Sequence, residues 1–424
     1  MRVLIVNTSD KTGGAAVAAH RLMEALKNHG VKAKMLVRDK TSDSLTVVGL
    51  PKSPLLRWHF LWERLLIFIR LRFSREHLFE IDIANAGTDI TRLPEFKEAD
   101  IIHLHWVNQG MLSLKDIRKI LRAGKPVVWT MHDIWPATAL CHYTRGCNNY
   151  KTQCHNCRFL PGGGSRSDLS TRVWKQKTAL LDGHNIFFVA CSRWLEGEAK
   201  KSALLKGQPV TNIPNAIDTR IYCPQDKRKA RQELGLPVDG RVILFVSQRV
   251  TDERKGVAYL IEAVKKLVDS HPELKADTTV AILGSHAQTV ADQLALPVHA
   301  LGYVSDERTI VSVYNAADVF VTPSLEDNLP NTIMESMACG VPCVGFRVGG
   351  IPEMIDHQNN GYVAQLRDSD DLARGMGWVL CEADGEKLRH EAVRKVTQHY
   401  SQTSVALRYI EIYQQAIAQK HFRL

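Results

Sequence analysis

Carboxylates and the start of a predicted helix lie together in residues 323–342, which read PSLEDNLPNTIMESMACGVP. Glu326 and Asp327 fall in a polar loop, and Glu335 lies about one turn inside a helix predicted over 331–338. The unpaired N–H groups and the positive dipole end at a helix N-terminus suit a phosphate or sugar hydroxyls, and Glu335 is close enough to accept hydrogen bonds from a ribose. A capped helix with solvated acids is the alternative explanation.

A second charged turn follows a strand predicted over 241–247. It contains Arg249, Arg254 and Lys255, directly before Gly256 and a predicted helix over 257–270. Fixed cations stabilise the negative charge that a leaving diphosphate gains in the transition state. A solvated charged turn explains such a segment when it is seen alone. Beside the acidic segment, a diphosphate site is the better interpretation.

Two features of the N-terminal half follow predicted strands in the same way. Gly13 and Gly14 come after a strand over 3–6 and let the backbone approach a ligand closely, although a tight turn also needs glycine. His132 follows a strand over 127–130. A lone histidine after a strand is more often structural.

The elements that position these residues form two series of alternating strands and helices, each typical of a parallel α/β domain. Because 424 residues exceed one ordinary core, we predict two doubly wound Rossmann-like domains. They are expected over 1–212 and 213–395, with a final helix in 396–424 packing back on the first domain. Ligands bind beyond the carboxyl ends of the strands in such sheets, which predicts a site in the cleft between the domains.

Composition narrows the partners without choosing one. The net charge of +10 fits nucleic acid, an anionic membrane surface or a phosphorylated substrate. The N-terminus does not read as a secretory signal peptide, and nine cysteines, an odd number, favour reduced thiols in the cytoplasm.

Residues 53–79 mix large apolar side chains with arginines too often for a transmembrane helix. At about 100° per residue, Arg57, Arg64 and Arg75 fall on one stripe and Arg72 lies nearby. A core helix with snorkelling arginines and an interfacial helix on an anionic leaflet remain equal alternatives.

Four cysteines cluster after His132, in a compact insertion over 141–157 that contains one Cys-x2-Cys pair. They are Cys141, Cys147, Cys154 and Cys157. Zn²⁺ favours such thiolates in closed structural sites, and His142 and His155 are spare candidate ligands. Four reduced, partly buried thiols are the alternative of equal weight.

Taken together, these motifs resemble the family-4 retaining glycosyltransferases of the GT-B fold, over residues 1 to about 365. In that family a Glu-x7-Glu signature binds the donor, the first acid contacting the sugar and the second the ribose. Asp327 stands at the first position and Glu335 at the second, with Glu326 as a substitute for the first. Asn328 opens the variant Asn-Leu-Pro, which is found in polysaccharide-assembly members in place of Gly-Phe-Gly.

The resemblance assigns further residues. Arg249 and Lys255 match the family's diphosphate-binding cations, with Arg254 able to share the role, and His132 matches an active-site histidine near the reacting sugar. The remaining donor-site residues that the resemblance implies are Gly13, Gly14, Asn328, Asn331 and Thr332. The cysteine segment resembles one in the colanic-acid and O-antigen branch of the family.

The resemblance therefore implies a retaining hexosyltransferase of cell-surface polysaccharide (exopolysaccharide) biosynthesis. A UDP- or GDP-sugar is the expected donor, and a polyprenyl-linked or growing oligosaccharide is the expected acceptor. The leaving phosphate takes the acceptor proton, so no strong protein base is expected. No catalytic cofactor is expected either, because Arg249 and Lys255 supply the charge at the diphosphate. The enzyme is expected in the cytoplasm, with peripheral attachment to the inner face of the membrane as an open alternative. The competing functions are a zinc-stabilised nucleic-acid-binding protein and a GT-B nucleotide-sugar epimerase or soluble disaccharide synthase.

Overall fold

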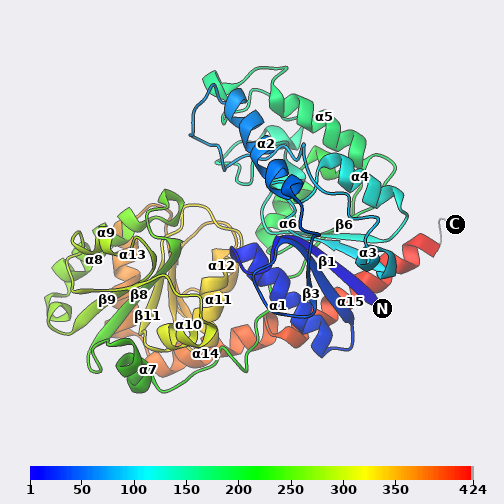
Figure 1. Cartoon of the computed structure of the whole chain (residues 1–424). Helices are drawn as coiled ribbons and strands as arrows, with labels where there is room; N and C mark the ends of the chain where they lie inside the picture. The colour runs from blue at the N-terminus through cyan, green and yellow to red at the C-terminus, as the bar shows by residue number, and fades with distance from the viewer. Residues whose placement is uncertain (422–424) are drawn as a thin grey trace. The chain divides into compact units, whose positions relative to one another are not determined.

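The computed structural model describes residues 1–421, and the chain divides into two compact units (Figure 1). Unit 1 comprises Met1–Ala216 together with the chain from Val405 onward, and unit 2 comprises Ile217–Ser404. Each unit is an α/β domain with its own parallel sheet. The predicted fold class of two such domains is therefore confirmed.

Unit 1 contains a seven-stranded sheet in the order β3-β2-β1-β4-β5-β6-β7. Its strands are β1 (Arg2–Ser9), β2 (Lys32–Asp39), β3 (Val47–Gly49), β4 (Ile101–Leu104), β5 (Val127–Met131), β6 (Phe187–Ala190) and β7 (Val210–Asn212). Its helices are α1 (Gly14–Asn28), α2 (Pro54–Arg70), α3 (Pro94–Glu98), α4 (Leu114–Arg122), α5 (Leu169–Leu181), α6 (Arg193–Lys200) and most of α15 (Gln402–His421).

Helices cover both faces of this sheet (Figure 1). Successive residues of β1 enter opposite cores, because side chains alternate along a strand. Val3 and Ile5 pack with α1 and α15, whereas Leu4 and Val6 pack with α2, α4 and α5. Strands buried on both faces read as continuous apolar runs, which is why their positions were predictable.

Unit 2 contains a six-stranded sheet in the order β10-β9-β8-β11-β12-β13. Its strands are β8 (Arg241–Arg249), β9 (Thr278–Ser285), β10 (Val298–Gly302), β11 (Val319–Thr322), β12 (Cys343–Phe346) and β13 (Gly361–Ala364). Its helices are α7 (Lys227–Leu234), α8 (Val257–Ser270), α9 (Gln288–Ala291), α10 (Glu307–Asn315), α11 (Asn331–Ala338), α12 (Ile351–Met354), α13 (Ser369–Gly377) and α14 (Gly385–His399).

The predicted helices over 257–270 and 331–338 are confirmed as α8 and α11. Within the described residues, no helix is both long enough and apolar enough to cross a membrane.

Candidate active site

The strand order of unit 2 reverses between β8 and β11, which lie next to each other. The chain runs outward from β8 to β9 and β10 and then returns to start again at β11. Loops that leave the carboxyl ends of two such strands diverge, and ligands bind in the crevice between them. The two segments singled out in the sequence are these two loops, so the topology brings the basic turn and the acidic loop together.

Lys255 and Asp327 form an ion pair across this switch point. Lys255 ends the short helical turn η5 (Glu253–Lys255) after β8, and its Nζ lies 2.6 Å from Oδ2 of Asp327, in the loop after β11. A guanidinium nitrogen of Arg254 lies 3.7 Å from the same oxygen and donates to the carbonyl of Glu326 at 2.9 Å. The carbonyl of Arg254 in turn accepts a hydrogen bond from the N–H of Leu325. The two loops are thus joined by charge and by backbone.

The electrostatics of the pair keep Asp327 ionised. Asp327 is 8% exposed, and burial alone would raise its pKa. The charges of Lys255 and Arg254, with hydrogen bonds from Lys255 and from the N–H of Asn328, outweigh burial and hold the pKa below its ordinary value.

Gly256 allows the basic turn to approach the acidic loop. Its φ is +71°, and a Cβ built there would lie 1.9 Å from the carbonyl oxygen of Pro323. Any side chain would push the two loops apart. A glycine at this position is therefore a requirement of the contact between the loops.

Glu335 lies in the first turns of α11, as predicted. Its Oε2 accepts a hydrogen bond of 2.8 Å from the hydroxyl of Tyr314 in α10, and the residue is 8% exposed. Pro330, the residue before the helix, makes no side-chain cap. Asn331 and Thr332 are half-buried at the start of the helix, and Asn328 is buried in the loop before it.

Arg249 is not drawn into this cluster. Its side chain is exposed, and its Nε donates to the hydroxyl of Thr251 at 3.1 Å. The register of β8 against β9 shifts between Val246 and Arg249, which ends regular pairing where the turn begins. Of the predicted cations, the structure therefore brings Lys255 and Arg254 to Asp327 and leaves Arg249 at the strand end.

The strand order of unit 1 reverses between β1 and β4. Gly13, with φ of +89°, is the residue that precedes α1 after β1, and Gly14 begins that helix. The segment after β4 is tied to β1, because Trp106 N–H donates to the side chain of Asn7 and its carbonyl accepts from Thr8. The glycine turn thus lies at the position where a doubly wound sheet binds ligands.

His132, which is half-buried, lies in a row with the buried His103 and His105 at this edge. Its Nε2 lies 2.9 Å from Nδ1 of His105, and its Nδ1 lies 3.5 Å from the sulfur of Cys191. His103 contacts the hydroxyls of Tyr413 and of a strand threonine, each at 2.7 Å. Burial lowers the pKa of His132 to about 4 although the adjacent carboxylate opposes the shift. The imidazole is therefore neutral at pH 7.

The residue after His132 is held by buried charges. Asp133 accepts hydrogen bonds from the Trp106 indole and from the Trp135 N–H. Nδ1 of His142 lies 2.7 Å from Asp133, and Nε2 of the same ring lies 2.6 Å from Asp82. Burial opposes the charge on His142, but the two carboxylates raise its pKa to about 10. His142 is therefore an imidazolium clamped between two carboxylates.

Comparison with known families covers both halves of the chain. Residues 12–221 match the family model described as Glycosyltransferase Family 4, and residues 240–382 match the one described as Glycosyl transferases group 1. This chain is built from two glycosyltransferase domains.

Relatives of this chain are about one quarter identical to it over the aligned residues. A D-inositol 3-phosphate glycosyltransferase of Corynebacterium jeikeium is 26% identical over 67% of this chain and 65% of its own length. An uncharacterized glycosyltransferase of Methanocaldococcus jannaschii is 26% identical over 80% of this chain and 90% of its own length. The match thus spans just under two thirds of the Corynebacterium relative.

Solved structures of similar fold cover the whole glycosyltransferase. Sucrose-phosphate synthase from Thermosynechococcus elongatus aligns with a TM-score of 0.65 at 19% identity, covering 99% of this chain and 100% of that one. Anabaena HepE, in complex with UDP-glucose, aligns with a TM-score of 0.62 at 17% identity and full coverage of both chains. At these identities the likeness establishes the fold, and it matches the predicted GT-B class.

The structure does not support the predicted zinc site in the cysteine insertion. Among the described residues, no three of the sulfur atoms of Cys141, Cys147, Cys154 and Cys157 lie within 4.8 Å of one another. All four are free thiols, and burial raises the pKa of Cys154 to about 12 and that of Cys157 to about 11. His142 is not available as a zinc ligand, because both of its ring nitrogens form hydrogen bonds with carboxylates. The arrangement of the sulfur atoms therefore gives no support for zinc over the alternative of partly buried thiols.

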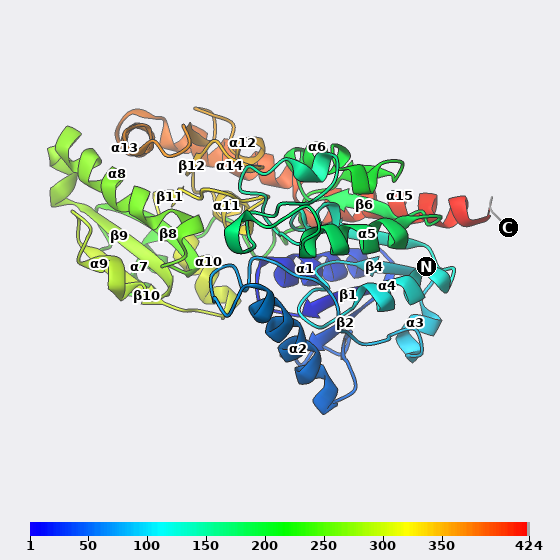
Figure 2. The same cartoon turned by 90° about the horizontal axis from the view of Figure 1, so that it is seen from above.

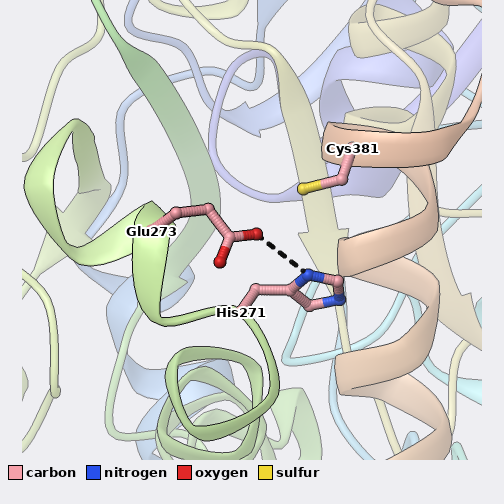
Figure 3. A group of neighbouring side chains, drawn as sticks. All are labelled: His271, Glu273 and Cys381. Carbon is pink, nitrogen blue, oxygen red and sulfur yellow. Dashed lines mark hydrogen bonds and ion pairs between the residues drawn. The ribbon is translucent and has the colours of Figure 1, made fainter.

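Two other features of unit 2 lie at the amino ends of its strands. His271, Glu273 and Cys381 are the one group within the described chain whose three ligand atoms lie within 4.8 Å of one another (Figure 3). Nδ1 of His271 lies 3.2 Å from Glu273, and these two residues precede β9, whereas Cys381 comes after β13. A cavity of about 420 Å³ is lined by Asp318 and Pro342, which precede β11 and β12. Both features lie at the opposite edge from Lys255 and belong to no part of the candidate site.

Sequence reasoning missed two residues with direct roles in the geometry. Tyr314 holds Glu335, and Asp82 holds His142. Each is separated from its partner by many residues, 21 in the first case and 60 in the second. A local motif carries no signal for such partners.

Proposed function

We propose that this glycosyltransferase moves a hexose from a UDP- or GDP-sugar to a lipid-linked or growing polysaccharide acceptor, with retention at the anomeric carbon. The observation that carries the donor half is the meeting of Lys255 and Arg254 with Asp327 at the switch point of unit 2. Two cations beside the start of α11 suit the diphosphate of a nucleotide sugar.

Each residue has a proposed role in this reaction. Lys255 and Arg254, with Arg249 at the same turn, neutralise the diphosphate as its bond to the sugar breaks. Asp327 orients the donor sugar, and Glu335, held by Tyr314, binds the ribose hydroxyls. The leaving phosphate oxygen accepts the proton of the acceptor hydroxyl while the new glycosidic bond forms on the same face. This step needs no strong protein base, in keeping with a neutral His132.

The acceptor is proposed to belong to polysaccharide assembly of the colanic-acid or O-antigen kind. The cysteine segment that follows the His-Asp-Ile-Trp-Pro sequence supports this proposal. A second candidate is a small anionic acceptor, because relatives at 26% identity are named D-inositol 3-phosphate glycosyltransferases. The two candidates share the donor site and differ in the acceptor.

Release of nucleoside diphosphate from a panel of UDP- and GDP-sugars tests the proposal. One arm contains a polyprenyl-diphosphate-linked sugar, and another contains D-inositol 3-phosphate. We expect release to accelerate with the lipid-linked acceptor and the product to keep the donor's anomeric configuration by NMR. Acceleration by D-inositol 3-phosphate alone would favour the second candidate, and a changed donor sugar without transfer would indicate an epimerase.

A further inference from the structure

Helix α2 lies at the outside of unit 1 (Figure 2). A row of large apolar side chains along this helix is exposed to solvent. We call this row the α2 stripe. Its members are Leu55, Trp58, Leu61, Trp62, Leu65 and Ile69, each at least 45% exposed. At 3.6 residues per turn they fall within an arc of about 120°. A monomeric protein seldom exposes a contiguous apolar surface of this kind unless the surface binds something.

The opposite side of α2 fixes this orientation. Ile67 and the following Leu71 are buried in the unit 1 core. Arg64 is buried as well, in an ion pair with Asp82 and a hydrogen bond of 2.6 Å to the carbonyl of Leu78. Glu63 is fully buried and accepts hydrogen bonds from two backbone N–H groups. Turning the stripe inward would break the buried ion pair between Arg64 and Asp82 and the hydrogen bonds of Glu63, which is energetically costly.

Exposed cations border the stripe. Arg57 and Arg70 fall on its two sides, because they lie about 100° from its centre in opposite directions at 3.6 residues per turn. The other exposed cations of residues 51–79 are Lys52, Arg72 and Arg75, against one exposed acid, Glu76. Phe73 and Phe79, which are 69% and 61% exposed, extend the apolar surface beyond the helix.

We propose that the α2 stripe and its bordering cations form a surface that lies on an anionic lipid bilayer. Tryptophan and leucine side chains enter the boundary between headgroups and acyl chains, and the arginines contact lipid phosphates. The headgroup region of a bilayer accommodates apolar and cationic side chains together. Water does not favour the apolar side chains, and a protein core does not favour the cations. The proposed function gives this contact its purpose, since a polyprenyl-linked acceptor resides in a membrane.

The charges argue against a second copy of the chain as the partner. Two α2 helices packed stripe to stripe would bring Arg57 and Arg70 of both copies together. The one carboxylate of α2, Glu63, is buried and cannot compensate them. An anionic bilayer offers negative charge along the whole stripe.

Sedimentation with vesicles tests this surface without any sugar donor. Vesicle binding can therefore be absent although the enzyme transfers sugar, and sugar transfer can be absent although the protein binds vesicles. The full chain is mixed with phosphatidylcholine vesicles or with vesicles that also contain phosphatidylglycerol, at low and high salt. We expect binding to the anionic vesicles that weakens with salt. Trp58→Ser with Trp62→Ser should weaken binding at least about tenfold.

A charge variant and its matched control separate the stripe from net charge. Arg57→Gln, Arg70→Gln and Arg72→Gln together should weaken binding roughly a hundredfold, at about fivefold per basic residue. The control removes the same charge from exposed positions elsewhere in unit 1, and it consists of Arg166→Gln, Arg172→Gln and Lys175→Gln. Arg64 is left unchanged, because its loss would break a buried ion pair.

Three results would overturn the proposal. Full recovery of the wild type in the supernatant under every condition is the first, and equal weakening by the charge variant and its control is the second. The third is a dimer, seen by analytical ultracentrifugation, that Trp58→Ser with Trp62→Ser abolishes in a protein that binds no vesicles. Unchanged thermal melting of each variant ensures that a loss of binding is not a loss of fold.

Discussion

Replacing Lys255 with methionine distinguishes its observed partner, Asp327, from its proposed partner, the donor diphosphate. The substitution keeps side-chain length and removes a cation 2.6 Å from a buried carboxylate. A wholly unpaired buried charge costs about 3–5 kcal/mol. Because Arg254 remains 3.7 Å from Asp327, we expect a smaller loss of unfolding free energy, about 1–2 kcal/mol.

The stability deficit should depend on pH with a definite sign. The lowered pKa of Asp327 contributes stability above its ordinary value of 3.8, and the contribution is lost as the pH falls through the lower folded value. Lys255→Met removes the charge and the hydrogen bond of Lys255, which are two of the causes that lower the pKa of Asp327. The deficit relative to wild type is therefore full at pH 7 and shrinks only as the pH falls below 3.8, which denaturant unfolding on both sides of that pH measures.

The catalytic loss should be larger than the stability loss and should not be rescued with it. Removing one fixed charge that stabilises a developing anion costs roughly 10²–10³ in rate. Adding Asp327→Asn to Lys255→Met should restore the melting temperature, since no buried charge is left unpaired. It should not restore the affinity for UDP or GDP, measured by calorimetry.

Two comparisons make this reasoning refutable. Lys265→Met, at an exposed position in the same unit, should leave both stability and nucleotide affinity unchanged. If Lys255→Met leaves nucleotide affinity unaltered in the Asp327→Asn background, then Lys255 serves only to pair Asp327 and the diphosphate role is wrong.

Three further predictions follow from single contacts. Gly256→Ala should lower both stability and turnover, because its Cβ would meet the Pro323 carbonyl at 1.9 Å; melting and nucleotide release measure the two effects. Wild type should lose stability between pH 6.5 and about 10, because the raised pKa of His142 contributes stability that is full below 6.5 and lost as the pH rises through 10. Denaturant unfolding of His142→Gln should show no such loss over that range. Tyr314→Phe removes a hydrogen bond of 2.8 Å to Glu335 and should raise KM for the donor several-fold, by about 1 kcal/mol, with a smaller change in kcat.

The strands, and the two loops of unit 2 that carry the candidate site, could be located in the sequence for a physical reason. The strands are apolar runs because both faces of each sheet are covered, and the two loops that meet at the switch point are each continuous in sequence. Lys255 and Asp327 could therefore be named before their contact was known. Their pairing with each other could not be predicted, because 72 residues separate them.

Residues 53–79 resisted prediction because both sides of α2 are apolar. Arg57 and Arg64 appeared to lie on one basic stripe, yet Arg57 is exposed and Arg64 is buried against Asp82. Helical periodicity places side chains on a face but does not say which face the core covers. That choice depends on a buried carboxylate 18 residues away.

The same carboxylate shows how the insertion over 141–157 is joined to the rest of unit 1. One carboxylate oxygen of Asp82 accepts a hydrogen bond from Arg64 of α2, and the other accepts one from His142. The second ring nitrogen of His142 donates to Asp133. Four charged side chains thus run from α2 to the residue after His132, all of them buried. Removing any one of these four side chains leaves an unpaired buried charge, which lowers the free energy of unfolding. Their contributions to stability therefore depend on one another. The insertion contributes His142 to this row, and the row connects α2 with the residue after His132 within unit 1.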